Sequence, residues 1–172
     1  MSELPAATLH ETADTLRARP VLRLTWEQYD QALDGLVGRL PKRDFAAIVG
    51  IARSGLIPAV QLAHRLQARC FGAIDIRRTT SDDVDAGKTE PRIGWLGLPD
   101  GLAERDVLLV DDVVGGGRTL EAARDLLRKR GLRITTCAVA VNLDNFKGGD
   151  LSDLLDSYGL LVHGWVQFPW AP

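Results

Sequence analysis

The sequence predicts one α/β domain in which a central, mostly parallel sheet is flanked by helices, and three observations support this prediction. Apolar runs at 45–51, 71–76, 107–110 and 134–141 have the composition of buried strands. Amphipathic helical patterns separate these runs, as in the strand–helix–strand units that build parallel sheets. With 172 residues, of which 45% are hydrophobic, the chain can form one sizeable core.

The N-terminal part is expected to contain a tail and then a helix. Residues 1–20 have weak periodicity, so we expect an N-terminal tail there and the domain itself at 21–172. Thr25 and Gln28 form a capping-box pattern, which predicts the start of a helix. Apolar residues then recur at three- and four-residue intervals as far as Leu40, directly before a proline that ends the pattern.

A strand–turn–helix unit and a long irregular segment follow. The strand at 45–51 leads through the turn 52–55 into a helix at 56–66, and a second strand follows at 71–76. Residues 77–102 show no sustained period and are rich in Asp, Gly, Thr and Pro. Because a loop of this length in a compact domain is usually functional or mobile, we expect it to form a flexible hood.

The second half of the chain repeats the alternation of strand and helix. A helix is expected at 119–130, with Gly131 as its C-cap, and a strand rich in β-branched residues at 134–141. Weaker patterns predict a short helix at 151–155 and a strand at 160–163.

The most informative stretch is the one that follows the apolar run at 107–110. Asp111 and Asp112 come directly after this run, and the turn 115–119 is rich in glycine and opens a helix. A glycine-rich turn at a helix N-terminus presents backbone N–H groups to an anion. Two carboxylates supply acceptors for sugar hydroxyls or ligands for a divalent metal. A sugar phosphate would satisfy both halves of this site.

Three features that are distant in sequence are expected to meet at one edge of the sheet. Parallel sheets bind their ligands outside the carboxyl ends of the strands. The turn that contains Arg53, the stretch 111–119 and the segment after Val141 all follow strands and belong to that edge. The sequence therefore predicts a single site there.

This combination resembles a type I phosphoribosyltransferase, a family with a Rossmann-like core and a flexible hood. The resemblance rests on the strand, acid pair and glycine turn at 107–119, and on 49–58, which is similar to the loop that holds pyrophosphate in that family. The order of features is closest to the bacterial xanthine-guanine branch, with Leu24-Thr25-Trp26 near the start and 165–170 near the end. The resemblance covers about residues 21–170.

The resemblance implies transfer of a phosphoribosyl group from phosphoribosyl pyrophosphate to a nucleobase, with purines favoured, and release of pyrophosphate. It implies that Asp111 and Asp112 are the catalytic residues and hold the ribose hydroxyls, and that Asp112 also supports Mg²⁺, the implied cofactor. Arg53 and Ser54 would contact the pyrophosphate, where an arginine fork can bind two oxygens. The 5′-phosphate would be bound by a turn that consists of Gly115, Gly116, Gly117, Arg118 and Thr119.

For the base, the resemblance implies three contact residues, and the sequence departs from the family pattern at two positions. Trp165 would stack on the base, the Val166 backbone would read its edge, and Asn142 stands where the purine branch has a lysine that reads the 6-oxo group. Gly115 stands where the 6-oxopurine enzymes have an aspartate that takes a proton from the purine. General acid–base help contributes roughly 10²–10⁴-fold to a rate, so its loss would affect ordinary purine salvage. The sugar half of the expected site keeps the family pattern, whereas the base half departs from it.

Other interpretations stay open at this point. Gly115 favours a non-catalytic relative that binds phosphoribosyl pyrophosphate or a nucleotide and regulates another process. A phosphate-binding protein with a different activity is a third class, in which the acid pair and Arg53 have no common role. Trp165 and Asn142 also have purely structural interpretations, as an aromatic residue that closes the core and as a strand-end turn residue.

Bulk properties limit the partners. The net charge of −2 argues against nucleic acid, because phosphate-backbone binding requires a basic surface. No apolar stretch reaches the roughly 20 residues of a membrane helix, and the N-terminus lacks the apolar core of a secretory signal. Cys70 and Cys137 have no metal-ligand spacing, so we expect two reduced thiols and a cytoplasmic protein. From the resemblance we expect a homodimer or higher homo-oligomer.

Overall fold

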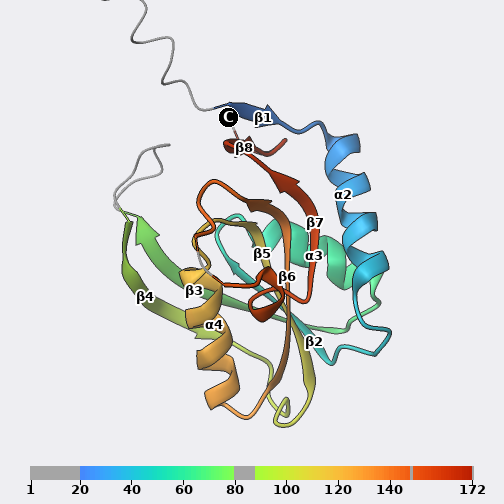
Figure 1. Cartoon of the computed structure of the whole chain (residues 1–172). Coiled ribbons are helices and arrows are strands. Elements are labelled where there is room, and N and C mark those ends of the chain that lie inside the picture. Colours follow the sequence, from blue (N-terminus) through green and yellow to red (C-terminus); the bar gives the residue numbers. More distant parts are fainter. Residues whose placement is uncertain (1–19, 80–87, 148, 172) are drawn as a thin grey trace, which may run out of the picture.

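A six-stranded sheet organises the fold in a computed structural model of the chain, which describes residues 20–79, 88–147 and 149–171 (Figure 1). In chain order the elements are β1 (Val21–Arg23), α2 (Trp26–Arg39), β2 (Ala47–Ala52), α3 (Leu56–Arg65), β3 (Cys70–Thr79), β4 (Lys88–Gly97), β5 (Asp106–Val114), α4 (Arg118–Lys129), β6 (Arg133–Asn142), the 3₁₀ turn η1 (Leu151–Asp153), β7 (Ser157–Val162) and β8 (Trp165–Gln167). The strand order is β4-β3-β2-β5-β6-β7. Only β4 runs antiparallel to its neighbour in this sheet, so the prediction of a mostly parallel sheet is confirmed.

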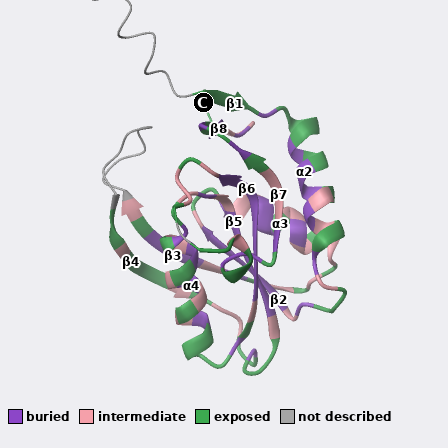
Figure 2. Cartoon of the chain, in the orientation of Figure 1, coloured by how far each residue is buried: buried purple, intermediate pink, exposed green. Residues whose placement is uncertain are grey.

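Helices cover both faces of the sheet (Figures 1 and 2). The residues of β5 alternate between two cores, because successive side chains of a strand point to opposite faces. Val107 and Leu109 pack in the core beneath α4, whereas Leu108 and Val110 pack in the core shared with α2 and α3. All four residues are fully buried, which explains why the central strand reads as a continuous apolar run rather than as an alternating one.

The start of α2 confirms the capping box that the sequence predicts. The Gln28 N–H donates to the Thr25 Oγ1 at 3.2 Å, and the Thr25 N–H donates to the Gln28 Oε1 at 2.9 Å. These bonds satisfy N–H groups that the first turn of a helix leaves unpaired. The helix ends with Arg39, before Leu40, as expected.

The segment 77–102 is more regular than the sequence predicts. The expectation of an irregular segment is wrong for most of its described part, because β3 continues to Thr79 and β4 pairs with it in antiparallel fashion. β4 is an edge strand whose ladder is interrupted by register shifts, and its Ile93 and Trp95 are exposed. An edge strand of this kind carries no clear alternation in its sequence. Residues 80–87 of the expected hood lie outside the described residues.

Several element boundaries differ from the sequence-based expectation. β5 continues to Val114, so the two acids lie on the strand and not after it. The short helix expected at 151–155 is the 3₁₀ turn η1 at Leu151–Asp153, and the strand expected at 160–163 is present as β7, which begins earlier, at Ser157, and ends at Val162. β1 and β8 pair in parallel as a separate two-stranded sheet, which the sequence did not indicate because each strand has only three residues. Residues 1–19 of the expected tail lie outside the described residues.

Among the described residues, none of the helices is both long enough and apolar enough to cross a membrane.

Candidate active site

The carboxyl ends of three parallel strands bring the predicted site residues to one edge of the sheet. β2 ends directly before Arg53, β5 carries Asp111 and Asp112, and β6 ends at Asn142. These strands are neighbours in the order β2-β5-β6. The convergence at one edge that the sequence predicts is therefore confirmed for the strands themselves.

The turn after β2 packs directly on β5 through Gly55. A Cβ atom at this glycine would lie 3.0 Å from the Val110 carbonyl oxygen and 3.1 Å from the Asp111 Cα. Only a residue without a side chain allows so close an approach between the two backbones. The exposed Arg53 and Ser54 therefore lie on a turn that is in contact with the strand of the acid pair.

The two acids differ in burial and share a hydrogen bond. Asp111 is buried and Asp112 is half-buried, and the Asp112 N–H donates to the Asp111 Oδ1 at 3.0 Å. Burial raises the pKa of Asp111 well above its usual range, and the neighbouring Asp112 charge raises it further. Burial also raises the pKa of Asp112. Two desolvated carboxylates side by side are stabilised by a ligand that donates hydrogen bonds or carries positive charge.

The glycine turn leads into α4 with helix N–H groups that no side chain caps. Gly117 is the N-cap residue, has a φ of +79°, and makes no side-chain hydrogen bond to the helix. The left-handed φ favours glycine here, and a Cβ atom at this position would also lie 2.5 Å from the Leu154 Cδ2, so that the Leu154 side chain would have to shift. The N–H groups of the first turn, which begins at Arg118 and Thr119, thus form the type of N-terminus that binds anions.

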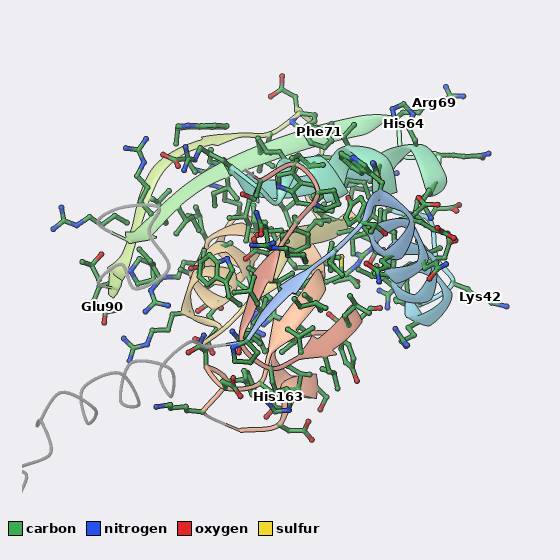
Figure 3. All side chains as sticks on the ribbon, turned by 90° about the horizontal axis from the view of Figure 1, so that it is seen from above. Lys42, His64, Arg69, Phe71, Glu90 and His163 are labelled. Carbon is green, nitrogen blue, oxygen red and sulfur yellow. The ribbon has the colours of Figure 1, made fainter. Side chains whose placement is uncertain are left out.

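An ion pair connects the glycine turn to β4. The Arg118 Nη1 donates to the Glu90 Oε1 at 2.6 Å, and both side chains are largely exposed. Figure 3 shows Glu90 near one end of the β3–β4 ribbon. This contact could not be predicted from the sequence, because the two residues are 28 positions apart and the segment that contains β4 was expected to be irregular.

The C-terminal aromatic residues divide into packed and exposed ones. The Phe168 and Trp170 rings stack with centroids 4.6 Å apart, and Trp170 packs edge-on against Tyr29 of α2 at 5.0 Å. These residues help to close the core beside α2. Trp165, in contrast, is 38% exposed at the start of β8, which leaves its ring accessible to a ligand.

The backbone of Val166 points away from β1. In a parallel pair, alternate residues of a strand bond to a given neighbour. The Trp165 N–H donates to the Pro20 carbonyl oxygen at 2.8 Å, and the Gln167 carbonyl oxygen accepts from the Leu24 N–H at 3.0 Å. The backbone groups of Val166, which lies between these two residues, therefore face the opposite side, as a residue that reads the edge of a base requires.

Asn142 is buried, and both ends of its amide are engaged within the fold. Its Nδ2 donates to the Gly164 carbonyl oxygen, and its Oδ1 accepts from the Asp144 N–H at 3.0 Å. The amide thus holds the turn after β6 against the loop that precedes β8.

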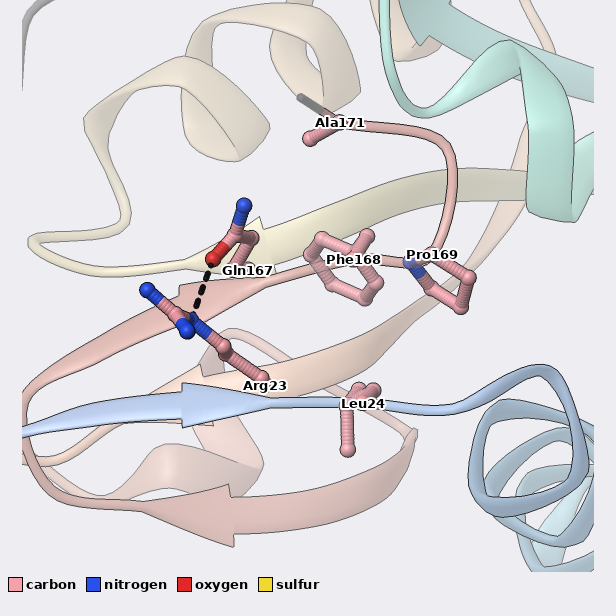
Figure 4. Close-up of a pocket in the computed structure, with 6 residues that line it drawn as sticks. All are labelled: Arg23, Leu24, Gln167, Phe168, Pro169 and Ala171. Atoms are coloured by element: carbon pink, nitrogen blue, oxygen red, sulfur yellow. Dashed lines mark hydrogen bonds between the residues drawn. The ribbon is translucent and has the colours of Figure 1, made fainter.

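A pocket of about 410 Å³ lies beside β1 and β8, and Figure 4 shows the residues that line it. They are Arg23, Leu24, Gln167, Phe168, Pro169 and Ala171. The Arg23 Nε donates to the Gln167 Oε1 at 2.9 Å within it. None of the residues predicted for the site lines this pocket, so the acid pair and the glycine turn identify the candidate site better than this hollow does.

Comparisons with known proteins agree with this geometry. Residues 26–172 match the phosphoribosyl transferase domain family. The chain is 32% identical over 168 residues to a xanthine-guanine phosphoribosyltransferase of Nitratidesulfovibrio vulgaris, with 92% of this chain and 88% of that protein covered. It is 30% identical over 154 residues to a protein of the same name from Chromohalobacter salexigens, with 86% and 82% covered.

A solved structure gives the same result at the level of the fold. The purine phosphoribosyltransferase of Pyrococcus horikoshii superposes with a TM-score of 0.71 at 30% identity, with 88% of this chain and 94% of that chain covered. The acid pair on β5, the glycine turn and the match over 26–172 together show that the chain belongs to the phosphoribosyltransferase family.

Proposed function

We propose that this transferase moves a phosphoribosyl group from phosphoribosyl pyrophosphate to a nucleobase, with purines favoured, and releases pyrophosphate. One observation carries the proposal. Asp111, Asp112 and the uncapped helix N-terminus at Gly117 lie on one continuous segment, in contact with the turn of Arg53. This segment offers acceptors for sugar hydroxyls and donors for a phosphate within a few residues.

The sugar half would act by orientation and by charge. Asp111 and Asp112 would accept hydrogen bonds from the ribose hydroxyls, and their negative charge would favour the positive charge that develops on the ribose ring as the bond to pyrophosphate breaks. The turn of Gly115, Gly116, Gly117, Arg118 and Thr119 would hold the 5′-phosphate. Arg53 and Ser54 would contact the departing pyrophosphate, whose leaving the arginine charge promotes.

The donor set fits Mg²⁺. Within the described ranges, no three metal-ligating side chains gather at one place. Mg²⁺ is often held by one or two carboxylates together with substrate oxygens, and Asp112 would supply such a carboxylate. When bound, the ion would neutralise charge on the pyrophosphate.

The base half would bind by stacking and by backbone contacts. The exposed Trp165 ring would stack on the base, and the outward backbone groups of Val166 would read its edge. Asn142 would contribute by holding the loop before Trp165, because its amide is already engaged. We also propose that the 77–102 segment closes over the site as a hood and that residues 1–20 form a tail outside the domain.

Two measurements test the proposed function. Phosphoribosyl pyrophosphate with Mg²⁺ should raise the melting temperature, because a ligand that binds only the folded state stabilises it. Release of pyrophosphate should then appear with at least one base in a panel of purines and pyrimidines. A thermal shift without turnover for any base would favour the non-catalytic regulatory relative, and no shift at saturating ligand would contradict the proposal.

The setting of the protein is part of the proposal. We propose a cytoplasmic homodimer or higher homo-oligomer, to be tested by light scattering coupled to size-exclusion chromatography. A monomer at micromolar concentration would contradict the oligomeric part and leave the proposed activity unaffected.

A further inference from the structure

A set of polar contacts ties the turn after β6 to the loop before β8. Its members are Asn142, Asp144, His163 and Gly164, and we call this set the clasp. Asn142 holds the Gly164 carbonyl oxygen, and the Asp144 carboxylate binds the other two residues. His163 lies on the loop between β7 and β8, where Figure 3 shows it at the surface.

The Asp144 carboxylate uses both oxygens in the clasp. Its Oδ1 lies 2.7 Å from the His163 Nδ1, and its Oδ2 accepts from the Gly164 N–H at 2.8 Å. A backbone bond of 2.9 Å from the Leu143 N–H to the Val162 carbonyl oxygen runs beside them. Hydrogen bonds to a charged acceptor are stronger than those between neutral groups, so the carboxylate dominates the clasp.

The clasp ends directly before the residue that would stack on the base. Gly164 has a φ of +83°, and a Cβ atom there would lie 2.0 Å from the Pro20 carbonyl oxygen. Its conformation is therefore closely confined, and it fixes the direction in which β8 begins. Trp165 follows at once and is 38% exposed, so its position depends on the backbone before it more than on packing in the core.

The clasp also approaches the sugar half. A Cβ atom at Gly116 would lie 3.7 Å from the Asn145 carbonyl oxygen, so the turn that contains Asp144 lies beside the glycine turn. A displacement of the 142–146 turn would therefore alter the distance between Trp165 and the glycine turn.

We propose that Asp144 is a positioning residue that, through His163 and Gly164, sets the place of Trp165 and the Val166 backbone for the base. This inference rests on the proposed function for its kinetic consequence. Asp144 does not touch the sugar in this account, so its loss should weaken the use of the base and leave the use of phosphoribosyl pyrophosphate unchanged.

The kinetic experiment compares variants that remove the carboxylate with variants that retain its contacts. Asp144→Ala should raise the KM for the base roughly tenfold, in line with the loss of hydrogen bonds to a charged group, and change the KM for phosphoribosyl pyrophosphate less than about twofold. Asp144→Asn keeps an acceptor for the Gly164 N–H but lacks the charge, and should therefore recover part of the loss. Asp100→Ala, an exposed carboxylate in the turn after β4, is the control.

A second pair of variants tests the histidine. His163→Asn places an amide near the Nδ1 position and should keep the base KM close to that of the wild type. His163→Gln extends its amide toward the Nε2 position and should raise that KM. Equal effects of the two substitutions would contradict a specific role of the Nδ1 contact.

Hydrogen exchange provides a readout that needs no turnover. In the wild type the hydrogen-bonded amides of Gly164 and Trp165 should exchange slowly, and Asp144→Ala should accelerate them about tenfold while the amides of β5 stay unchanged. Unchanged exchange at Gly164 and Trp165, or equal changes in the KM values of both substrates, would contradict the proposed role of Asp144. Absence of turnover in the wild type would contradict the proposed function alone, because the exchange measurement still decides the clasp.

Discussion

The sugar half and the base half of the site are built in different ways. The sugar half consists of one continuous segment, from Asp111 to Thr119, on a central strand whose apolar residues are fully buried. The base half is assembled from the end of β6, the loop before β8 and the three-residue strand β8. The shape of the sugar half depends on local sequence, whereas the shape of the base half depends on contacts between distant segments. The family pattern is therefore easier to recognise in the sugar half than in the base half.

This difference shows where the chain can vary without loss of the fold. A change at 111–119 alters a buried strand and a glycine with a required conformation. A change at Asn142, Asp144 or His163 alters polar contacts at the rim of the sheet. We expect the choice of base to be set in the second region, and the binding of the activated sugar in the first.

Gly115→Asp should have the largest effect and sharpens the comparison. A carboxylate at the position of the missing proton acceptor should raise kcat with a 6-oxopurine by roughly 10²–10⁴-fold. The measurement is the steady-state rate of pyrophosphate release with guanine, xanthine and hypoxanthine. The control is Gly38→Asp, an exposed position on α2 where a Cβ atom would meet nothing within 4 Å. Equal rates for Gly115→Asp and the wild type would show that the reaction does not lack a general base at position 115.

Asp112→Asn should weaken binding of phosphoribosyl pyrophosphate with Mg²⁺ by about 10- to 150-fold. Loss of a hydrogen bond to a charged group costs about 1.5–3 kcal/mol, which corresponds to this range. Isothermal titration calorimetry gives the affinity, and urea unfolding checks that the fold is retained. Asp100→Asn removes the same charge at an exposed turn and should bind normally. An unchanged affinity for Asp112→Asn would remove this residue from the sugar half.

Gly117→Ala should destabilise the protein by about 1–2 kcal/mol, because a non-glycine residue is strained in the left-handed region. Contact with Leu154 would add to the effect, since the new Cβ would lie 2.5 Å from its Cδ2. Gly116→Ala is the matched control and should be close to neutral, because Gly116 has no left-handed φ and its Cβ would make only an ordinary van der Waals contact with the Asn145 carbonyl oxygen at 3.7 Å. Equal free energies of unfolding for the two variants would contradict the conformational requirement at Gly117.

Glu90→Gln should have the smallest effect and tests whether the β4 contact competes with the phosphate. Exposed ion pairs contribute little, so release of Arg118 should tighten binding of phosphoribosyl pyrophosphate by no more than about threefold. The gain should decrease as salt is added. Glu104→Gln, on the turn before β5, serves as the control. Weaker binding by Glu90→Gln would indicate that Glu90 supports the site and does not compete at it.

The sequence was sufficient for the parts of the molecule that depend on local patterns. The buried strands, the capping box of α2 and the convergence of Arg53, Asp111 and Asn142 at one edge all follow from periodicity and from the geometry of parallel sheets. The acid pair and the glycine turn can also be recognised without a structure, because they occupy fixed positions relative to a buried strand.

The parts that the sequence did not predict depend on contacts between distant residues. β4 is an edge strand and shows no clear alternation of apolar and polar residues. β1 and β8 have three residues each, which is too few to show such an alternation. The Glu90–Arg118 pair and the clasp join residues 28 and about 20 positions apart, for which one sequence offers no signal. From the sequence alone, Asn142 could equally be an exposed residue that contacts the base or a buried residue that holds the loop before β8. The structure shows that its amide donates to the Gly164 carbonyl oxygen in that loop.

The most direct test is a crystal structure of the protein with phosphoribosyl pyrophosphate and magnesium. The 5′-phosphate should lie within the turn that begins at Gly115, with the ribose hydroxyls on the carboxylates of β5. Density for the sugar at another place, with that turn empty and both acids directed into the protein, would contradict the central claim.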